Sequence, residues 1–451
     1  MATTTDKAAT LKTGEGLRRQ LGVWSVVAIV VGEVIAVGIF LVPAEMAKSI
    51  GSPLWLLVVW TVMGGMALSG ALCYGELAAR FPEAGGSYVY LREVYGPRLA
   101  FLYGWKCFLV MDPGLTAALA VGLASYAGYM VRLSQAGVRI VAICAIILLA
   151  GLNMLGVKVG AELMRWLTIV KLGSLVFIVA WGFGRGLGDW SNFTPFVEQH
   201  SGSSPLVMAL AGGMVSAFFA FGGWWEVARI TGEVRDPARV MPRAMAIGVC
   251  LVTIVYVLTS AVFLYLVPIE RVATGETFAA QAGEALFGRA GGDVFSMIVI
   301  FSVLGSLAGF IMVAPRIYYA MSRDGLFLKS AAAIHPRFGT PVRAIALQAA
   351  LASLLVLVGT FDEILAYFIF ITVVFIALTV AGVFVLRRRG GDSPFMTPAY
   401  PITPLIFLAL VSALLVLLAA GRPQQALSGL AVVLVGLPVY HFAFHKRKRR
   451  G

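Results

Sequence analysis

Three charged side chains stand inside long, mostly apolar runs of this chain: Lys171, Glu33 and Asp112. A charge in the middle of a bilayer costs roughly 2.5–3.5 kcal/mol on insertion scales, and such groups usually serve a function. A buried ammonium or carboxylate carries a proton, binds a charged solute or forms a permanent ion pair. Lys171 is therefore a candidate coupling cation or proton carrier, with a structural ion pair as the alternative. Asp112 is a candidate pathway residue or partner of Lys171.

Glycine-containing segments interrupt two of the apolar runs near their middle. Residues 32–38 have the sequence GEVIAVG, and residues 219–225 have the sequence FAFGGWW. A glycine inside a helix costs about 1 kcal/mol relative to alanine, so each segment predicts an unwound break. Unwinding frees N–H groups on one half-helix, which attract a carboxylate, and C=O groups on the other, which attract an ammonium. The two breaks would together bind the zwitterion of an α-amino acid. Close helix packing at small residues is the alternative explanation.

The composition indicates that the apolar runs are membrane spans. Of the 451 residues, 60% are apolar and 13% are charged, and the mean hydropathy is +0.90. Soluble domains carry about 25% charged residues, so a soluble enzyme, a coiled coil and a disordered chain are excluded. The four cysteines lie in apolar runs without CxxC spacing and are expected to be buried. No histidine lies in the middle of an apolar run, so we expect neither a metal nor a cofactor.

Twelve segments are apolar enough to cross a bilayer as helices, which takes about 20 residues each. They are residues 22–48, 54–79, 99–125, 138–157, 162–184, 205–231, 243–267, 292–320, 341–359, 363–387, 402–420 and 425–444. With the N-terminus in the cytoplasm, cytoplasmic segments hold 26 Lys and Arg and the other side holds seven. This bias predicts a multi-pass protein of the cell membrane with both termini cytoplasmic.

The two breaks lie in spans 1 and 6. Each of these spans would be the first of a unit of five, so the chain divides into two units. Residues 22–187 would hold spans 1–5 and residues 205–389 spans 6–10, followed by two further spans in 390–445. Five spans per unit force the second unit to enter from the opposite face, so the repeat is inverted. Paired interrupted spans are typical of a transporter binding site. The flanking tails, 1–21 and the basic 446–451, are expected to be cytoplasmic, the latter contacting lipid headgroups rather than nucleic acid.

Five stretches of the sequence resemble the amino acid–polyamine–organocation transporters, in particular the bacterial L-type-like amino acid permeases. They begin at Gly32 (GEVIAVGIF), Gly70 (GALCYGELAARFPEAGGSYVYLREVY), Phe218 (FFAFGGWWEVARITGEVRDPARVMPR), Pro315 (PRIYYAMSRDGLFLKSAAAIHPRFGTP) and Ala381 (AGVFVLRRRGGDSPFMTPAYPITP). The resemblance implies an all-α, LeuT-like fold of ten core helices plus two. It also implies secondary active transport of amino acids by alternating access, through exchange or proton coupling.

The resemblance further implies roles for single residues. The substrate carboxylate would meet backbone N–H groups near the start of the second half of span 1, and the ammonium would meet carbonyls of both breaks. Phe221 would be an aromatic gate, and Lys171 would replace a sodium site and bridge span 5 to spans 1 and 8. The candidate substrate-binding residues are Val34, Ile35, Ala36, Val37, Gly38, Phe219, Ala220, Phe221, Gly222, Trp224 and Trp225, and the candidate coupling residues are Lys171, Glu33 and Asp112.

The chain departs from this family at four site positions: Ala36 stands in place of a Gly, Val37 in place of a Ser or Ala, and the other two are Glu33 and Trp225. Glu33 stands where relatives usually carry Ser or Thr, and Trp225 stands where many L-type relatives carry Asn. Glu33 would attract a substrate ammonium, pair with Lys171 or act as a second proton site, and these three alternatives remain open. Among the other charges, Lys106 is expected to snorkel or pair, and Glu226 is expected to pair with a residue three positions on, Arg229.

Other function classes have weaker support in the sequence. Glu33 favours an amine or polyamine transporter of the same fold as the alternative function. An intramembrane enzyme would need a nucleophile–base or metal constellation within the spans, and a channel would need rings of pore-lining charge. Neither pattern is visible. The expected partners are a small amino acid, or an amine, and the lipid bilayer. No cysteine falls in an external loop, so we expect no disulfide-linked partner subunit.

Overall fold

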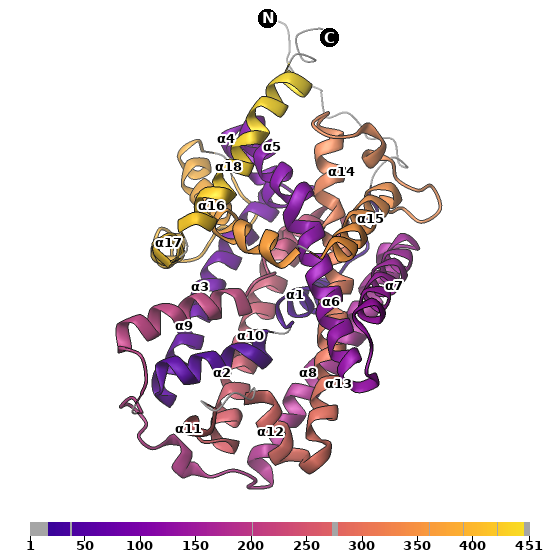
Figure 1. Ribbon diagram of the computed structural model, residues 1–451. Helices are drawn as coiled ribbons and strands as arrows, with labels where there is room; N and C mark the ends of the chain where they lie inside the picture. The colour runs from indigo at the N-terminus through magenta and orange to yellow at the C-terminus, as the bar shows by residue number, and fades with distance from the viewer. Residues whose placement is uncertain are drawn as a thin grey trace, which may run out of the picture.

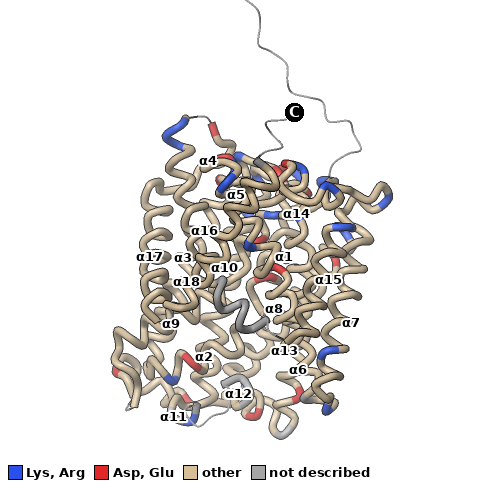
Figure 2. Tube along the Cα trace, turned by 45° about the horizontal axis from the view of Figure 1, so that its top comes forward, with Lys and Arg blue, Asp and Glu red and all other residues tan. Residues whose placement is uncertain are grey.

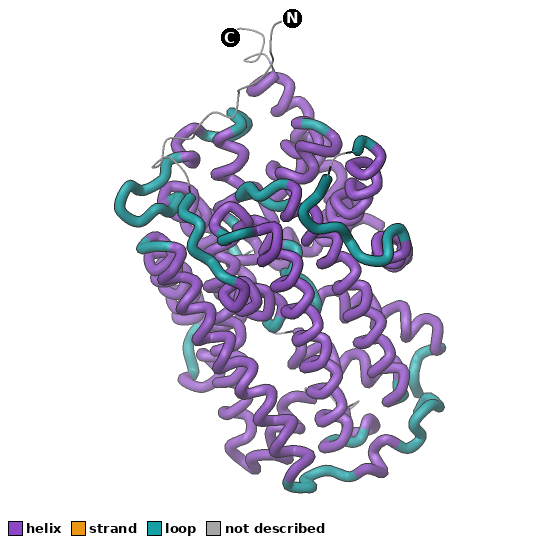
Figure 3. Tube along the Cα trace, turned by 180° about the vertical axis from the view of Figure 1, so that it is seen from behind, coloured by secondary structure: helices purple, strands orange, loops and turns teal. Residues whose placement is uncertain are grey.

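The computed structural model describes residues 17–445 apart from 37, 201, 273–277, 360, 391 and 422. Helices make up most of these residues (Figure 3), and the described chain contains no strand beyond one isolated bridge between Leu21 and Val234. Val37, residues 1–16 of the predicted N-terminal tail and the predicted basic tail 446–451 lie outside the described residues.

The first apolar run forms two helices instead of one. α1 spans Val23–Val34 and α2 spans Gly38–Ile50, and their axes differ by 45°. Ile35 follows α1 with a ψ of 89°, which is outside the helical range, so the helix ends there. The break predicted at residues 32–38 is confirmed, and it falls in the second half of that segment.

The sixth apolar run is also broken. α9 ends at Ala220, residues 221–225 form turns, and the tighter helix η3 follows over Glu226–Glu233. Gly223 has a φ of +114°, which a residue with a side chain rarely adopts. The glycine pair in this run therefore marks the position of the break.

The other spans follow the predicted order. In the first unit they are α3 (Pro53–Arg80), α5 (Pro97–Lys106) continuing through the π-helical turn η1 (Cys107–Met111) into α6 (Asp112–Val131), α7 (Gln135–Met154) and α8 (Val157–Gly184). In the second unit they are α9 (Leu206–Ala220), α10 (Pro237–Leu266), α13 (Gly291–Val313), which runs into α14 (Pro315–Arg323), α15 (Val342–Val358) and α16 (Phe361–Arg388). The last two spans are α17 (Ile402–Gly421) and α18 (Pro423–Val439). Within the described residues, nine helices and the bent pair are long enough to cross a membrane, and α9 and α15 are shorter apolar helices.

Short helices that the sequence did not predict lie at the two ends of the bundle. α4 (Ser87–Tyr95) lies at one end, and α11 (Ile269–Val272) and α12 (Phe278–Phe287) lie at the other (Figure 1). The prediction of an all-helical membrane protein is confirmed.

The N-terminal segment is attached to the end of the sixth span. The backbone N–H groups of Gln20 and Leu21 donate to Glu233 O at 2.8 and 3.0 Å, and Arg235 N–H donates to Leu21 O at 2.9 Å. We call these four residues the N-terminal clasp. At the other end of the chain, the rings of Phe444 and Phe101 lie 5.4 Å apart, beside the start of α5. Both described ends therefore lie on the face that holds α4, which we call the clasp face.

α1 lies at the centre of the bundle and packs against α8, α10 and α13 (Figure 1). Its residues from Val26 to Val34 are all buried. Peripheral helices present apolar side chains outward, such as Ile147 and Leu148 on α7, which are at least 60% exposed. Such an apolar exterior is what contact with lipid requires.

Charged residues concentrate at the ends of the bundle, and a few lie in its interior (Figure 2). Arg229 and Arg316, which fall near the ends of the predicted spans 205–231 and 292–320, are fully buried. The expectation of four buried cysteines was wrong for two. Cys73 and Cys107 are buried, whereas Cys144 and Cys250 are exposed on lipid-facing sides of their helices, because an apolar run alone does not tell which face meets lipid.

Candidate functional site

The two broken spans contact each other at their breaks. A Cβ at Gly38 would lie 2.9 Å from Ala220 Cα, and a Cβ at Gly223 would lie 2.9 Å from Glu33 O. Real Cβ atoms essentially never come so close to other heavy atoms, so both positions need glycine. The glycines of each break thus allow the other break to approach.

Tyr256 of α10 joins the two breaks through its hydroxyl group. The hydroxyl lies 3.0 Å from Val34 O and 2.9 Å from Ala220 O, the carbonyls at the ends of α1 and α9. The Tyr256 ring packs against Trp60 and Phe221 and is fully buried. Our sequence analysis missed this residue, and its only signal is a tyrosine within an apolar span.

Replacing Tyr256 by phenylalanine is expected to destabilise the protein by about 1–3 kcal/mol, because two helix-end carbonyls lose their donor. We also expect a higher KM for transport, since the breaks line the cavity described below. Thermal unfolding in detergent and uptake kinetics measure the two effects. The control is Tyr126→Phe on α6, a half-exposed tyrosine without a side-chain hydrogen bond to the described chain. Equal behaviour of both variants would contradict the bridging role.

Lys171 connects three spans at the first break. Its ammonium donates to Gly32 O at 3.0 Å, to Ile35 O, and to Ser306 Oγ of α13 at 3.2 Å. Ser306 Oγ itself donates to Gly32 O at 2.7 Å. Lys171 is 1% exposed, so it does not snorkel to an interface. α8 is thus bonded to α1 and α13, which are the spans that the sequence analysis named.

Glu33 lies in the last turn of α1 and is 7% exposed. Its Oε1 atom has no hydrogen-bond partner within the described chain. A Cβ at Gly309 of α13 would overlap Oε1, so that glycine leaves the space which the carboxylate occupies. Glu33 and Lys171 are both described and form no direct ion pair, because carbonyl and hydroxyl groups hold the ammonium instead. Of the three alternatives for Glu33, direct pairing with Lys171 is therefore not the one that the structure shows.

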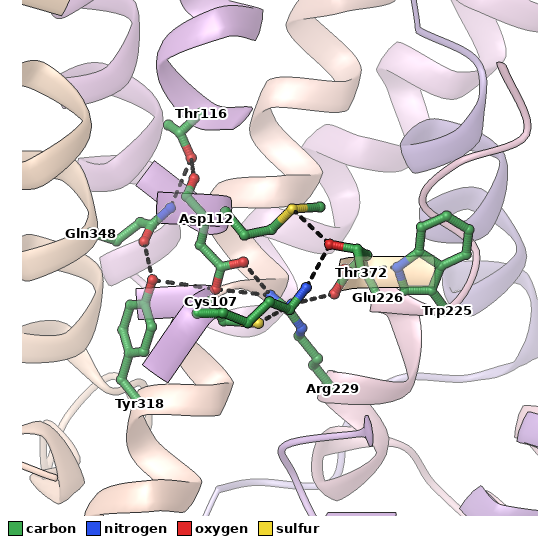
Figure 4. A network of polar contacts seen from close by, with 11 residues as sticks. Cys107, Asp112, Thr116, Trp225, Glu226, Arg229, Tyr318, Gln348 and Thr372 are labelled. Carbon is green, nitrogen blue, oxygen red and sulfur yellow. Dashed lines mark hydrogen bonds and ion pairs between the residues drawn. The ribbon is translucent and has the colours of Figure 1, made fainter. Parts of the chain in front are cut away.

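Asp112 pairs with Arg229 and not with Lys171 (Figure 4). Arg229 Nη1 lies 3.1 Å from both carboxylate oxygens of Asp112, and Arg229 Nη2 lies 2.5 Å from Glu226 Oε2. All three residues are at most 2% exposed. The local pair of Glu226 with Arg229 was predicted. The suggested pairing of Asp112 with Lys171 was wrong, because the Arg229 side chain of η3 reaches the first residue of α6 and pairs with this carboxylate.

Hydrogen bonds extend this charged cluster to neighbouring helices (Figure 4). On one side of the cluster, Trp225 Nε1 donates to Glu226 Oε1 at 2.8 Å. On the other side, Tyr318 OH contacts Asp112 at 3.2 Å. Nearby, Gln348 Nε2 donates to Thr116 Oγ1 at 2.8 Å. Lys106 is buried near this cluster and donates to Thr372 Oγ1 at 2.7 Å. Lys106 therefore does not snorkel, since the π-helical turn that follows it lies within the bundle and not at its end.

A cavity of about 490 Å³ lies beside the two breaks. The predicted site residues that line it are Glu33, Val34, Ala36, Gly38, Phe219, Ala220, Gly222 and Trp225. Further lining residues that sequence reasoning missed include Met111, Leu115, Ser216, Phe218, Phe310 and Thr372. They come from η1, α6, α9, α13 and α16, so no local pattern in the sequence connects them.

Four predicted substrate-binding residues are not among the lining residues. Ile35 is fully buried, and its carbonyl accepts from Lys171. Phe221, the expected aromatic gate, packs against Trp60 and Tyr256, and Trp224 packs against Tyr74. Their side chains are 1% exposed, because each turns from the break into the packed interior. The fourth, Val37, lies outside the described residues.

The cavity extends away from the clasp face. Its lining runs along α2 through Leu41 to Glu45, while Glu226 marks its inner end. Beyond Glu226 the chain is packed, since Gly85 N–H donates to Arg229 O at 2.9 Å.

Ion pairs hold the clasp face together. Arg92 of α4 lies 2.7 Å from Asp324, and Arg316 lies 2.9 Å from Glu233. Burial alone would lower the pKa of Arg92, but hydrogen bonds to Asp324 and its negative charge raise that pKa above its ordinary value. Arg92 therefore remains charged at any physiological pH.

Comparison with known proteins gives matches over nearly the whole chain. The family model described as "Amino acid permease" matches residues 21–438. The serine/threonine exchanger SteT of Bacillus subtilis (strain 168) is 31% identical over 440 residues, which cover 96% of this chain and 98% of that protein. The human large neutral amino acids transporter small subunit 2 is 29% identical over 95% of this chain and 81% of its own length. The human cystine/glutamate transporter is 29% identical over 94% and 85%.

Proposed function

This chain belongs to the amino acid permease family, and we propose from this premise how it transports its substrate. The chain is a multi-pass membrane protein that transports amino acids, and it is a transporter and not an enzyme. The proposal is that the cavity beside the two breaks binds the amino acid. The observation that carries it is the contact between the broken spans, because it brings free helix ends of opposite polarity to one cavity.

The helix ends match the two charges of an α-amino acid. α2 begins at Gly38 and presents the unpaired N–H groups of its first turn, which favour the substrate carboxylate. α1 and α9 end at Val34 and Ala220, and their carbonyls favour the ammonium. Tyr256 has one hydroxyl proton to share between these two carbonyls, so oxygen lone pairs of both carbonyls remain for the substrate.

Lys171 supports the proposed coupling of substrate binding to conformation. It bonds the unwound end of α1 to α13, so any motion of the break relative to α13 must rearrange those bonds. Asp112 was a coupling candidate, but its carboxylate is already matched by Arg229. We therefore propose Lys171, with Glu33 beside the cavity, as the coupling residues.

The structure corresponds to one stage of the proposed alternating access. The cavity extends away from the clasp face, and ion pairs close that face. We propose that residues 22–187 and 205–389 are inverted units of five spans, with spans 11 and 12 in 390–445 outside this core, and that the clasp face opens at another stage of the transport cycle. Each unit begins with a broken span, which supports this division.

We propose that the clasp face is cytoplasmic and that the protein lies in the cell membrane. The support is the excess of Lys and Arg in the segments of that face and the location of both described chain ends there. We also propose that no disulfide joins the chain to a partner subunit, because all four cysteines lie within membrane helices. The tails 1–21 and 446–451 are proposed to be cytoplasmic.

Uptake into vesicles tests this function. In proteoliposomes, amino acid uptake is expected to saturate, because each cycle loads one binding site. Unlabelled amino acid inside is expected to accelerate uptake in an exchanger, and an inward proton gradient is expected to drive it in a proton symporter. Protein-free vesicles provide the background. Flux that rises linearly with concentration would indicate a channel and contradict alternating access.

A further inference from the structure

The wall of the cavity is acidic. Glu33, Glu226 and Glu45 line it, whereas no Lys or Arg appears among its described lining residues. The nearby cations Lys171 and Arg229 lie behind the wall, where backbone carbonyls and carboxylates respectively hold them. A solute in the cavity therefore meets carboxylates before it meets any cationic side chain.

Glu33 is a buried carboxylate in this wall, and one of its oxygens has neither a hydrogen-bond nor an ion-pair partner in the described chain. Glu226 accepts from Trp225 Nε1 and pairs with Arg229, and Glu45 lies at the exposed end of the cavity. Glu33 is 7% exposed, and its Oε1 atom makes no hydrogen bond to the described chain. A buried carboxylate without a partner is strongly unfavourable, so a cation that enters the cavity gains from contact with Glu33.

Helix ends and aromatic rings add to the attraction for a cation. Glu33 belongs to the last turn of α1, where the helix dipole is already negative. Phe218 and Trp225 lie in the wall with stacked rings 5.8 Å apart, and Phe219 is 40% exposed. Aromatic faces bind ammonium groups by cation–π attraction. These features exceed what the single ammonium of a neutral amino acid requires.

We propose that the substrate carries a second ammonium group, as dibasic amino acids do, and that Glu33 receives this group. The inference rests on the proposed function, in which the helix ends at the breaks bind the α-carboxylate and α-ammonium. Glu226 keeps its partners, and Glu45 concentrates cations at the mouth of the cavity.

Competition against labelled lysine in proteoliposomes tests this assignment. The competitors are lysine, ornithine, norleucine, which matches lysine but lacks the second ammonium, and cadaverine, which lacks the carboxylate. We expect lysine and ornithine to compete at least about tenfold better than norleucine, as a charge-assisted hydrogen bond implies. Glu33→Gln is expected to reduce this ratio towards one, and Glu33→Asp, which keeps the charge, is expected to retain a preference for lysine. The control is Glu162→Gln on the exposed side of α8, which should keep the wild-type ratio.

Equal competition by norleucine and lysine in the wild-type protein would overturn the proposal, as would an unchanged ratio in folded Glu33→Gln. If Glu33→Gln does not fold, the wild-type ratio and the Glu33→Asp ratio decide. Competition by cadaverine as strong as that by lysine would instead contradict zwitterion binding at the breaks and leave the second-ammonium assignment standing. Saturable uptake of neutral amino acids without lysine preference would contradict only the second-ammonium assignment.

Discussion

Replacing Lys171 by alanine is expected to reduce amino acid transport in proteoliposomes roughly a hundredfold or more. The change leaves the carbonyls of Gly32 and Ile35 and the hydroxyl of Ser306 without their ammonium donor. Hydrogen bonds to charged groups contribute about 1.5–3 kcal/mol each, and about 2.7 kcal/mol corresponds to a hundredfold change in rate. Initial uptake rates measured at several pH values give the size of the effect.

Lys158→Ala is the matched control, because Lys158 lies on the same helix but is exposed. It is expected to transport at the wild-type rate. Thermal unfolding of both variants separates a loss of transport from a loss of folded protein. If Lys171→Ala transported at the wild-type rate with the wild-type pH dependence, Lys171 would have no role in coupling.

Replacing Arg229 by methionine is expected to destabilise the protein by about 3–5 kcal/mol, the cost of removing one partner from a buried charge cluster. Asp112 and Glu226 would be left as buried carboxylates without their common cation. Thermal unfolding in detergent measures this loss, and uptake measurements are expected to show less active protein after mild heating.

Neutralising the two carboxylates together with the arginine is expected to restore most of that stability. The variant combines Asp112→Asn, Glu226→Gln and Arg229→Met, so none of these three positions keeps a charge. Arg165→Ala is the surface control. Arg165 lies 3.5 Å from Glu162 with both side chains more than half exposed, so its loss is expected to change stability by about 0.5 kcal/mol or less. An Arg229→Met protein as stable as wild type would contradict the structural role of the cluster.

The spans and their breaks were predictable because their signals are local. Helical rise sets the length of an apolar run that crosses a bilayer, and glycines mark where α1 and α9 end. Lys171 stood out because a charge at that depth needs a reason. The structure supplies one in the carbonyls of Gly32 and Ile35, which are free to accept because the helix ends there.

The parts of the site that sequence reasoning missed depend on contacts between distant segments. Arg229 is 117 residues from Asp112, and only the folded bundle brings the two side chains together. The inward turn of Phe221 and the reach of Tyr256 to both breaks follow from the packing of α10 and Trp60. The depth of Lys106 was misjudged because a π-helical turn follows it within the bundle.

The N-terminal clasp and the Tyr256 hydroxyl tie the broken spans to each other at two different depths. One span cannot slide past the other unless two sets of bonds break together. These are the three backbone hydrogen bonds of the N-terminal clasp and the hydrogen bonds of the Tyr256 hydroxyl in the interior. The two broken spans should consequently move together as one rigid unit. An expression tag or fusion that displaces Gln20 and Leu21 would break the bonds of the N-terminal clasp. These bonds are separated from the substrate by about ten helical residues of α1, which is roughly 15 Å.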